Sequence, residues 1–414
     1  MLNSNLKKLQ IMASSVKTKP MRLPQFTDEP RVAHFVTSIG KTDDGGRGLS
    51  LFNEKEAELK SIAEFFERLS ATTCSMMTTA GTYEKVSANK LAIHPAEFSP
   101  FHPNQMISFD FSRFKLVGDE PYRWTSVTSL TDKSNALIPV QLVKLERVPA
   151  EEKIIRFPDS SGLSLGVSQK DALLRGLLEV IERDSLISSW YEEKKWNKLT
   201  DLELPVKIKK VISYLNRYKL RVEIFDISND LTPYIFFAII WDESPNPDCH
   251  LSVGSKASDT FSKSILGAIE EALQGRYIGK YSKLIQDSPS NVLSYKDHVK
   301  FWAKEGRTLE HLIQNKITDC GIDGHVKTTR KPNVLKLSDI IRNAKKKEVR
   351  IFYKDLTNKL LFENGFSCVK VISPDLKPLF ADQNFPYFGF LRGRDLGNYT
   401  FFEEERFKVP HPFG

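Results

Sequence analysis

Three stretches of the chain carry hydrophobic residues at helical spacing, with polar residues on the opposite face. This pattern predicts helices over residues 53–72, 169–191 and 259–281. Each stretch is long enough to bury one face against a sheet or another helix. Helices of this kind are therefore expected to be the main packing elements of the fold.

Strands are expected where β-branched or aromatic residues alternate with charged ones, at residues 221–225, 348–353 and 367–372. The first two run into similar acidic-hydroxyl turns, one from Asp226 to Ser228 and one from Asp355 to Thr357. The mixture predicts an α+β fold with helices packed on mostly antiparallel sheets. The repeated strand–turn unit suggests an internal duplication as a hypothesis.

The composition changes once along the chain. Residues 1–24 contain five basic residues and no acid, which predicts a basic, flexible N-terminal tail. No low-complexity linker interrupts residues 25–414, so these are expected to form one domain that ends in a proline-containing tail at 409–414. Turn-forming residues at 287–291 predict a loop between two halves of this domain.

The net charge of +8 suits an acidic partner such as a nucleotide or an acidic peptide, although the basic residues are dispersed enough to be ordinary surface. No interleaved basic and aromatic pattern indicates nucleic-acid binding. The apolar runs are shorter than the roughly 20 residues of a membrane span. Four widely spaced cysteines without a CxxC pair are typical of reduced thiols, so we expect a cytoplasmic protein that contacts neither nucleic acid nor membrane.

An acidic motif recurs on the predicted helices. The pattern ExxER occurs at residues 64–68 and again at 179–183, and a variant with Gln in place of the second acid begins at Glu271. Acids three residues apart share one helix face, and the residues between them are apolar. Crowded carboxylates near a core need a positive partner, either arginine or Mg²⁺. One copy is explained by an ordinary salt-bridged helix, but the recurrence favours a site for Mg²⁺ and phosphate.

Glycine and serine precede each of these helices, at residues 45–50, 160–166 and 252–255. Backbone N–H groups in such segments can hold phosphate at a helix start. No Walker A loop and no Rossmann fingerprint occurs in the sequence. Each segment alone is equally consistent with a plain loop.

These segments resemble the motifs of the YcaO family, the cyclodehydratases of thiazole/oxazole-modified microcin biosynthesis. Residues 161–184 resemble the second nucleotide motif of the family most closely, while 63–70 resemble the first and 253–276 the third. Residues 355–379 are also similar to the family, and the whole resemblance runs over roughly residues 40–414. The resemblance implies a YcaO-type ATP-binding fold with ATP and Mg²⁺ as cofactors.

The resemblance also assigns roles to individual residues. The positions implied to contact the nucleotide are Glu64, Asp171, Glu179, Arg183, Gln274 and Arg276. The positions implied to bind Mg²⁺ are Glu64, Glu67, Glu179, Glu182 and Glu271. Asp171 stands where the family usually has Glu, and Lys60 stands where it commonly has Ser.

The chain ends with Pro410, Pro412 and Gly414 at alternate positions. Azoline-forming YcaO enzymes often end in a PxPxP-like tail that reaches the active site, so the resemblance implies a catalytic role for these three residues. From the residues alone, the prolines predict a stiff, extended terminus, with a frayed tail as the alternative. His411 between them is a candidate general base or simply a tail residue.

The function implied is an ATP-dependent cyclodehydratase, or heterocyclase, that phosphorylates a backbone amide oxygen of a ribosomally made precursor peptide. Cys, Ser or Thr side chains of that peptide would cyclise to thiazolines or oxazolines, as in bacteriocins and microcins. The expected partners are the precursor, an E1-like or ThiF-like protein that binds its leader peptide, and a flavin-dependent dehydrogenase in the same complex. Two alternatives remain: thioamide or amidine formation on the same fold, and a non-catalytic ATP-binding scaffold.

Overall fold

The computed structural model describes residues 2–39, 45–107, 109–116, 118–192, 195–284, 291–318, 334–389 and 405–413. Most of the predicted loop at 287–291 lies outside these ranges, as does Gly414. Among the helices in these ranges, none is both long and apolar enough to cross a membrane.

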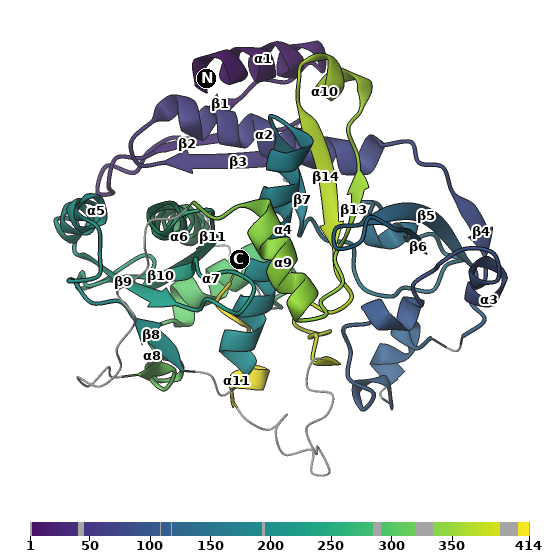
Figure 1. The fold of residues 1–414 in the computed structure, drawn as a ribbon. Coiled ribbons are helices and arrows are strands. Elements are labelled where there is room, and N and C mark those ends of the chain that lie inside the picture. The colour runs from purple at the N-terminus through teal and green to yellow at the C-terminus, as the bar shows by residue number, and fades with distance from the viewer. Residues whose placement is uncertain are drawn as a thin grey trace.

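The strands form three sheets (Figure 1). The three-stranded sheet has the order β1 (Met21–Arg22), β2 (Ala33–Thr37), β3 (Gly46–Ser50). The five-stranded sheet has the order β11 (Leu251–Ala257), β10 (Ile235–Asp242), β9 (Leu220–Asp226), β8 (Trp196–Lys198), β12 (Ile317–Thr318). The six-stranded sheet has the order β4 (Thr79–Gly81), β5 (Tyr122–Ser129), β13 (Phe352–Asp355), β14 (Ser367–Ile372), β7 (Leu163–Gly166), and β6 (Asn135–Pro139) pairs with β5. Where the structure describes them, the strand pairs are antiparallel except β8 with β12, which confirms the mostly antiparallel prediction.

The three predicted long helices are present as α2 (Glu54–Thr73), α4 (Gln169–Tyr191) and α6 (Phe261–Leu284). Local caps set two of their starts. The Asn53 side chain accepts hydrogen bonds from the first backbone N–H groups of α2, and the Ser168 side chain accepts one from the Asp171 N–H. Capping and apolar periodicity are sequence-local, which is why these boundaries were predictable.

Shorter helices complete the described fold. They are α1 (Leu2–Ser15), α3 (Tyr83–Ser87), α5 (Val206–Asn216), α7 (Tyr295–Glu305), α8 (Glu310–Gln314), α9 (Leu337–Lys346), α10 (Lys359–Glu363) and α11 (Glu405–Lys408). Short 3₁₀ helices occur at Pro95–Phe98, Gln105–Ile107, Phe109–Phe114 and Val140–Leu142. In Figure 1, α1, α2 and the three-stranded sheet lie at the top, and the two larger sheets lie to the left and right.

Three strand–helix units surround the centre of the molecule: β3 with α2, β7 with α4, and β11 with α6. Each strand packs against the helix that follows it in sequence. Each helix also contacts the strand of the next unit: α2 contacts β7, α4 contacts β11 and α6 contacts β3. The three units therefore close into a ring.

Glycines let each strand approach its helix closely. A Cβ at Gly46 would lie 2.1 Å from the backbone oxygen of Ser61, and a Cβ at Gly254 would lie 2.1 Å from the backbone nitrogen of Ala272. The glycine- and serine-rich segments expected to be phosphate-holding loops are thus largely strands β3, β7 and β11. Their glycines allow close packing of helix on strand. The sequence alone does not distinguish such a glycine from one that belongs to a loop.

The two predicted strand–turn units are confirmed. After β9 the Ser228 N–H donates to Asp226 Oδ1 at 2.9 Å, and after β13 the Thr357 N–H donates to Asp355 Oδ1 at 2.9 Å. The strand expected from residue 348 begins only at Phe352, because α9 ends at Lys346 and Glu348 adopts a left-handed backbone with φ of 56°. The two units lie in different sheets, and an internal duplication stays a hypothesis.

The core of the described structure consists of three main clusters of buried side chains. One cluster of buried side chains, which includes Trp190, Tyr191 and Trp196, connects α4 to the five-stranded sheet and the C-terminal segment. A second cluster lies between α1, α2 and the six-stranded sheet. A third lies between the five-stranded sheet and helices α5 and α6. Helix α4 contacts both larger sheets, the six-stranded one at β7 and β14 and the five-stranded one at β11.

The expectation of a flexible tail over residues 1–24 was wrong for its first half. Residues Leu2–Ser15 form α1, whose apolar face, including Leu6, Leu9 and Met12, is buried against α2 and its surroundings. Lys7 and Lys8 of this helix are exposed, on the face away from the buried residues. Tertiary packing of this narrow apolar stripe stabilises a helix that composition alone does not indicate.

Met12 is fully buried and Ile11 beside it is more than half exposed, so the two test the packing of α1. We expect Met12→Ala to lower the free energy of unfolding by about 2–5 kcal/mol, because it opens a cavity under α1. Ile11→Ala is the control and should change it by less than about 0.5 kcal/mol. Chemical denaturation measures the free energy of unfolding of each variant. Equal, small decreases in both would show that α1 is not packed against the rest of the fold.

Candidate functional site

Glutamates of the long helices accept hydrogen bonds from backbone N–H groups of the strands. Within one unit, the Arg47 N–H donates to Glu64 Oε2 at 2.7 Å and the Ser255 N–H donates to Glu271 Oε2 at 2.9 Å. Charge-assisted bonds of this kind fix each carboxylate relative to the strand that it faces. The motif acids are therefore structural contacts as well as candidates for chemistry.

Similar bonds join neighbouring units of the ring. From α2, Glu67 Oε1 accepts the Leu165 N–H of β7 at 2.6 Å. From α4, Glu182 Oε2 accepts the Ala257 N–H of β11 at 2.5 Å. From α6, Glu270 Oε1 accepts the N–H of Leu51, just after β3, at 3.0 Å. One glutamate from every long helix thus links its unit to the next.

The carboxylates inside this ring are crowded and poorly solvated. Burial, together with the charges of Glu64 and Glu179, raises the pKa of Glu67 to about 8. Burial and the charge of Glu182 raise the pKa of Glu271 to about 7, and burial also raises the pKa of Glu179. Such shifts mean that the negative forms lack compensation in the protein alone.

Two basic side chains face this group of acids. Burial disfavours the charged form of Arg183, but the carboxylates of Glu182 and Glu179 outweigh it and raise its pKa. The same balance raises the pKa of Lys256 on β11. Arg183 Nη2 lies 3.8 Å from Glu179 Oε1, while its buried Nη1 makes no hydrogen bond in the described structure. An unpartnered buried guanidinium N–H suits an anionic ligand such as phosphate.

The acids also suit Mg²⁺, but not as one cage. In the described ranges no three His, Cys, Asp or Glu side chains gather closely enough to hold a metal ion by themselves. Mg²⁺ is usually bound by one or two carboxylates together with water and phosphate oxygens. Glu67 and Glu271 each use only one carboxylate oxygen for a strand N–H, so each has a second oxygen for a cation. The residues present therefore fit Mg²⁺ bound together with a polyphosphate.

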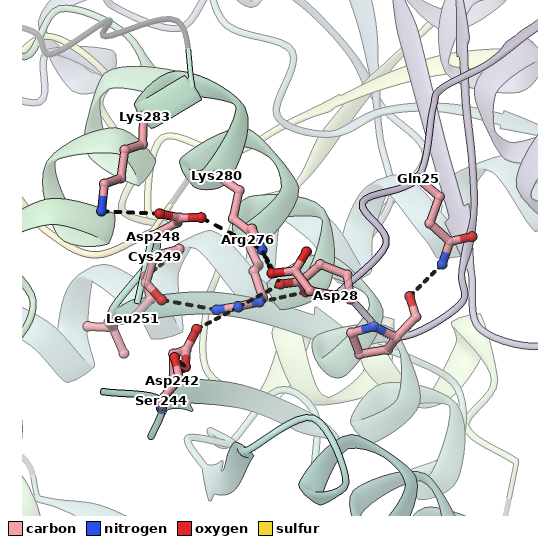
Figure 2. Close-up of polar contacts among 12 residues, drawn as sticks. Gln25, Asp28, Asp242, Ser244, Asp248, Cys249, Leu251, Arg276, Lys280 and Lys283 are labelled. Atoms are coloured by element: carbon pink, nitrogen blue, oxygen red, sulfur yellow. Dashed lines mark hydrogen bonds and ion pairs between the residues drawn. The ribbon is translucent and has the colours of Figure 1, made fainter. Parts of the chain in front are cut away.

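Arg276, expected to contact the nucleotide, lies in a different network (Figure 2). Its guanidinium donates to both carboxylate oxygens of Glu29 at 2.7 and 2.8 Å, to Asp242 Oδ2 at 2.6 Å and to the Cys249 carbonyl at 3.0 Å. Lys280, one turn later on α6, pairs with Asp28 at 2.6 Å and with Glu29 at 2.9 Å. In this structure Arg276 anchors the segment before β2 to α6.

Two further predicted nucleotide contacts occupy ordinary positions. Asp171 lies in the first turn of α4, where it accepts the Val167 N–H at 3.2 Å and pairs with Arg175 at 3.1 Å. Gln274 is half-buried on α6, three residues after Glu271. A role for either at a nucleotide stays a prediction.

A cavity of about 740 Å³ opens beside α2. Its lining includes Arg68 of the first ExxER motif, Asp159, Tyr295 and the segment from Leu379 to Asp382. The buried amine of Lys370 donates to the Asp159 carbonyl at 2.6 Å from behind this wall. Asp159 and Lys370 were not singled out from the sequence, although a lysine within the apolar strand at 367–372 is a usable signal for a buried charge.

The C-terminal segment is packed rather than frayed. Pro410, His411 and Pro412 are buried, and Gly414 lies outside the described residues. His411 Nε2 lies 2.8 Å from the Phe380 carbonyl, and burial, with the charge of His298, holds the pKa of His411 well below its ordinary value. The ring of His411 is therefore engaged in holding the tail and does not face the cavity as a base.

Glu67 and Glu271 predict a pH dependence for Mg²⁺ binding. Both carboxyls must lose their protons to bind a cation, so affinity should rise between pH 6 and about 8, with protons released on binding near pH 7. Without metal the folded state holds more protons than the unfolded state above pH 4.5, so stability should fall as pH rises towards 8. Calorimetry with Mg²⁺ and a non-hydrolysable ATP analogue in buffers of different ionisation enthalpy counts the protons. Binding that is independent of pH over this range would contradict the assignment.

Arg276 predicts a loss of stability rather than a direct loss of nucleotide contact. Arg276→Met should destabilise the fold by about 3–5 kcal/mol, because it leaves the carboxylates of Glu29 and Asp242 without their shared partner. Lys283→Met removes an exposed pair with Asp248 and should cost less than about 1 kcal/mol. Unchanged stability with weakened ATP binding would instead place Arg276 at the phosphates.

Comparison with known proteins gives a consistent result. A family model described as YcaO cyclodehydratase, ATP- and Mg²⁺-binding, matches residues 46–377. No curated protein sequence matches the chain. The fold is similar to a heterocyclase solved with substrate and cofactor, at a TM-score of 0.71 and 18% identity over 91% of this chain. The chain spans only 52% of that heterocyclase.

Two other solved structures match over most of their own length. The YcaO protein of Methanopyrus kandleri, bound with AMPPCP and Mg²⁺, has a TM-score of 0.60 and 13% identity, with 91% of each chain covered. A chain of the E. coli microcin synthetase McbBCD complex has a TM-score of 0.61 and 18% identity, with 86% of this chain and 88% of that one covered. At such identities these likenesses establish the fold.

Proposed function

Because the chain belongs to the YcaO cyclodehydratase family, which binds ATP and Mg²⁺, we propose that it is a peptide heterocyclase. Its substrate would be a ribosomally made precursor peptide whose Cys, Ser or Thr side chains close onto the preceding backbone carbonyl as thiazolines or oxazolines. The observation that supports the proposal is the group of crowded carboxylates around Arg183, those of Glu179, Glu182 and Glu271. The buried Nη1 of Arg183 has no hydrogen-bond partner in the described structure. Glu179 has its pKa raised by burial and bonds no strand in the described structure, so a scaffold would have no need for its charge.

The bound nucleotide would supply the phosphoryl group that turns the amide oxygen into a leaving group, and Mg²⁺ would neutralise its phosphates. The protein's contribution would be electrostatic. Glu67, Glu179 and Glu271 would hold the metal, and Arg183 and Lys256 would face the phosphate oxygens. The cavity lined by Arg68, Asp159 and the 379–382 segment offers space beside this site for a peptide.

The cyclisation balances as loss of water. The substrate side chain forms one bond to the carbonyl carbon and loses its proton, the amide nitrogen also loses its proton, and the carbonyl oxygen leaves with phosphate. No flavin motif occurs in the sequence, so oxidation to the aromatic azole would need the separate flavin-dependent dehydrogenase. A leader-peptide-binding protein is proposed as a further partner. The fold match to a microcin synthetase complex, one form of which has pro-MccB17 bound, supports a multiprotein assembly acting on a peptide.

Glu179 offers a direct test of the site, because in the described structure its carboxylate pairs with Arg183 and accepts no hydrogen bond from a strand. Glu179→Gln keeps the size and removes the charge, so we expect peptide-dependent phosphate release to fall by about 10²-fold or more. Glu54→Gln, on an exposed turn of α2, is the matched control and should keep normal activity. Near-normal phosphate release by Glu179→Gln would remove the nucleotide site from this ring.

The mass of a treated peptide, together with the site of ring closure read from its fragmentation, decides the reaction. Loss of one water for each modified residue is the expected outcome for azoline formation. Replacement of oxygen by sulfur, or loss of water with ring closure through an amine, would identify the thioamide- or amidine-forming alternative. ATP–Mg²⁺ binding without any change in peptide mass, when the full partner set is present, would identify a scaffold.

A further inference from the structure

Helix α7 presents two buried side chains to the C-terminal segment. His298 and Trp302 lie one helical turn apart, and both are almost fully buried. Trp302 Nε1 donates to the Pro410 carbonyl at 2.8 Å, and His298 Nδ1 lies 2.8 Å from the His411 carbonyl. Two consecutive carbonyls of the tail are therefore held by one face of one helix.

The same histidine also contacts the cavity wall. His298 Nε2 lies 2.9 Å from the Ala381 carbonyl, and His411 of the tail reaches the neighbouring Phe380 carbonyl through Nε2 at 2.8 Å. Phe380 and Ala381 both line the cavity beside α2. His298 thus stands between the tail and the wall, with one ring nitrogen directed at each.

Ring contacts hold the arrangement together. The rings of His298 and His411 stack with centroids 4.1 Å apart and planes 15° from parallel. Phe413, at the end of the tail, packs edge-on against Trp190 of α4 at 6.3 Å, and Trp190 packs edge-on against Trp302 at 5.7 Å. The tail is therefore wedged between α7 and the helix that carries the second ExxER motif.

These contacts are specific rather than general packing. The carbonyls at 380, 381, 410 and 411 belong to irregular backbone, so neither a helix nor a sheet satisfies them in the described structure. A buried carbonyl without a donor is costly. A neutral imidazole donates from one ring nitrogen at a time, so His298 serves the carbonyl of His411 or that of Ala381, while Trp302 serves that of Pro410. A side chain that keeps the ring shape of His298 or Trp302 but cannot donate would leave the corresponding carbonyl without its donor. The imidazole of His298 and the indole N–H of Trp302 therefore fix the path of the C-terminal segment.

We propose that His298 and Trp302 are positioning residues that fasten the segment Pro410–Phe413 to the cavity wall at Phe380–Ala381, so that tail and wall keep one relative placement. The consequence for catalysis rests on the proposed function, together with the catalytic role that the family resemblance implies for Pro410 and Pro412. In the described structure the polar contacts of both residues go to the tail and the cavity wall and not to the carboxylates around Arg183, so we expect nucleotide binding to be independent of them.

The first test needs no substrate. Hydrogen exchange on the whole chain compares His298→Phe and Trp302→Phe with the unmodified protein, with exposed His311→Phe as the control. Loss of a donor should raise exchange about tenfold in peptides covering 405–413 and 377–389, and not in those covering α2. ATP–Mg²⁺ affinity should stay within about twofold. Exchange unchanged in both segments overturns the proposal.

The second test separates positioning from general stability. His298→Phe and deletion of residues 410–414 should each lower kcat for peptide cyclisation, with the KM for ATP unchanged. Their combination should lose no more than the deletion alone, because the histidine would act through the tail. His298→Gln, which keeps a donor, should restore part of the rate. Additive losses of kcat overturn the proposal. If hydrogen exchange changes as expected but the unmodified chain cyclises no peptide, the proposed function is overturned instead.

Discussion

Hydrogen bonds from strand backbone to helix glutamates are the contacts on which this fold depends. Glu67, Glu182 and Glu270 each accept an N–H group from the strand region of the next unit, and in this way three strand–helix units close into a ring. An acid is well suited to this contact, because a carboxylate accepts from a backbone N–H more strongly than a neutral group does. The same choice brings negative charge into a poorly solvated centre. The bonds that close the ring thus also generate the electrostatic demand for cations.

Because the same carboxylates close the fold and require cations, the site residues cannot be divided into structural and functional ones. Glu182 is bonded by the Ser255 hydroxyl at 2.6 Å and by the Ala257 N–H, so its loss would disturb β11 as well as the charge of the centre. Glu179 accepts no such bond from any strand that the structure describes and is therefore the cleaner reporter of electrostatics. A motif match alone cannot rank the acids in this way. The ranking comes from which backbone groups each acid bonds.

Sequence patterns predicted the elements whose causes are local. The three long helices follow from apolar spacing and from caps such as Asn53 and Ser168, and the turns after β9 and β13 follow from an aspartate two residues before the bonded N–H. The glycine-rich strands were mistaken for loops because glycine is required there by close approach to a helix, and that cause lies in another element. The same is true of α1, whose stripe of apolar residues is meaningful only against α2.

In the candidate site, too, the residues with local causes were predicted and those with long-range causes were not. The acids and Arg183 were found because they repeat at fixed spacing on helices, whereas the partner of Arg276, Glu29, lies 247 positions earlier in the chain, and nothing local signals the pair. The C-terminal segment is a further long-range case. Trp302, Trp190 and Phe413 come from separate parts of the sequence, and the tail can dock only after α4 and α7 have met. The ring of carboxylates likewise exists only when all three units have closed. Formation of the site is therefore coupled to completion of the fold, and a partly folded chain would display the motifs without the electrostatics that give them a function.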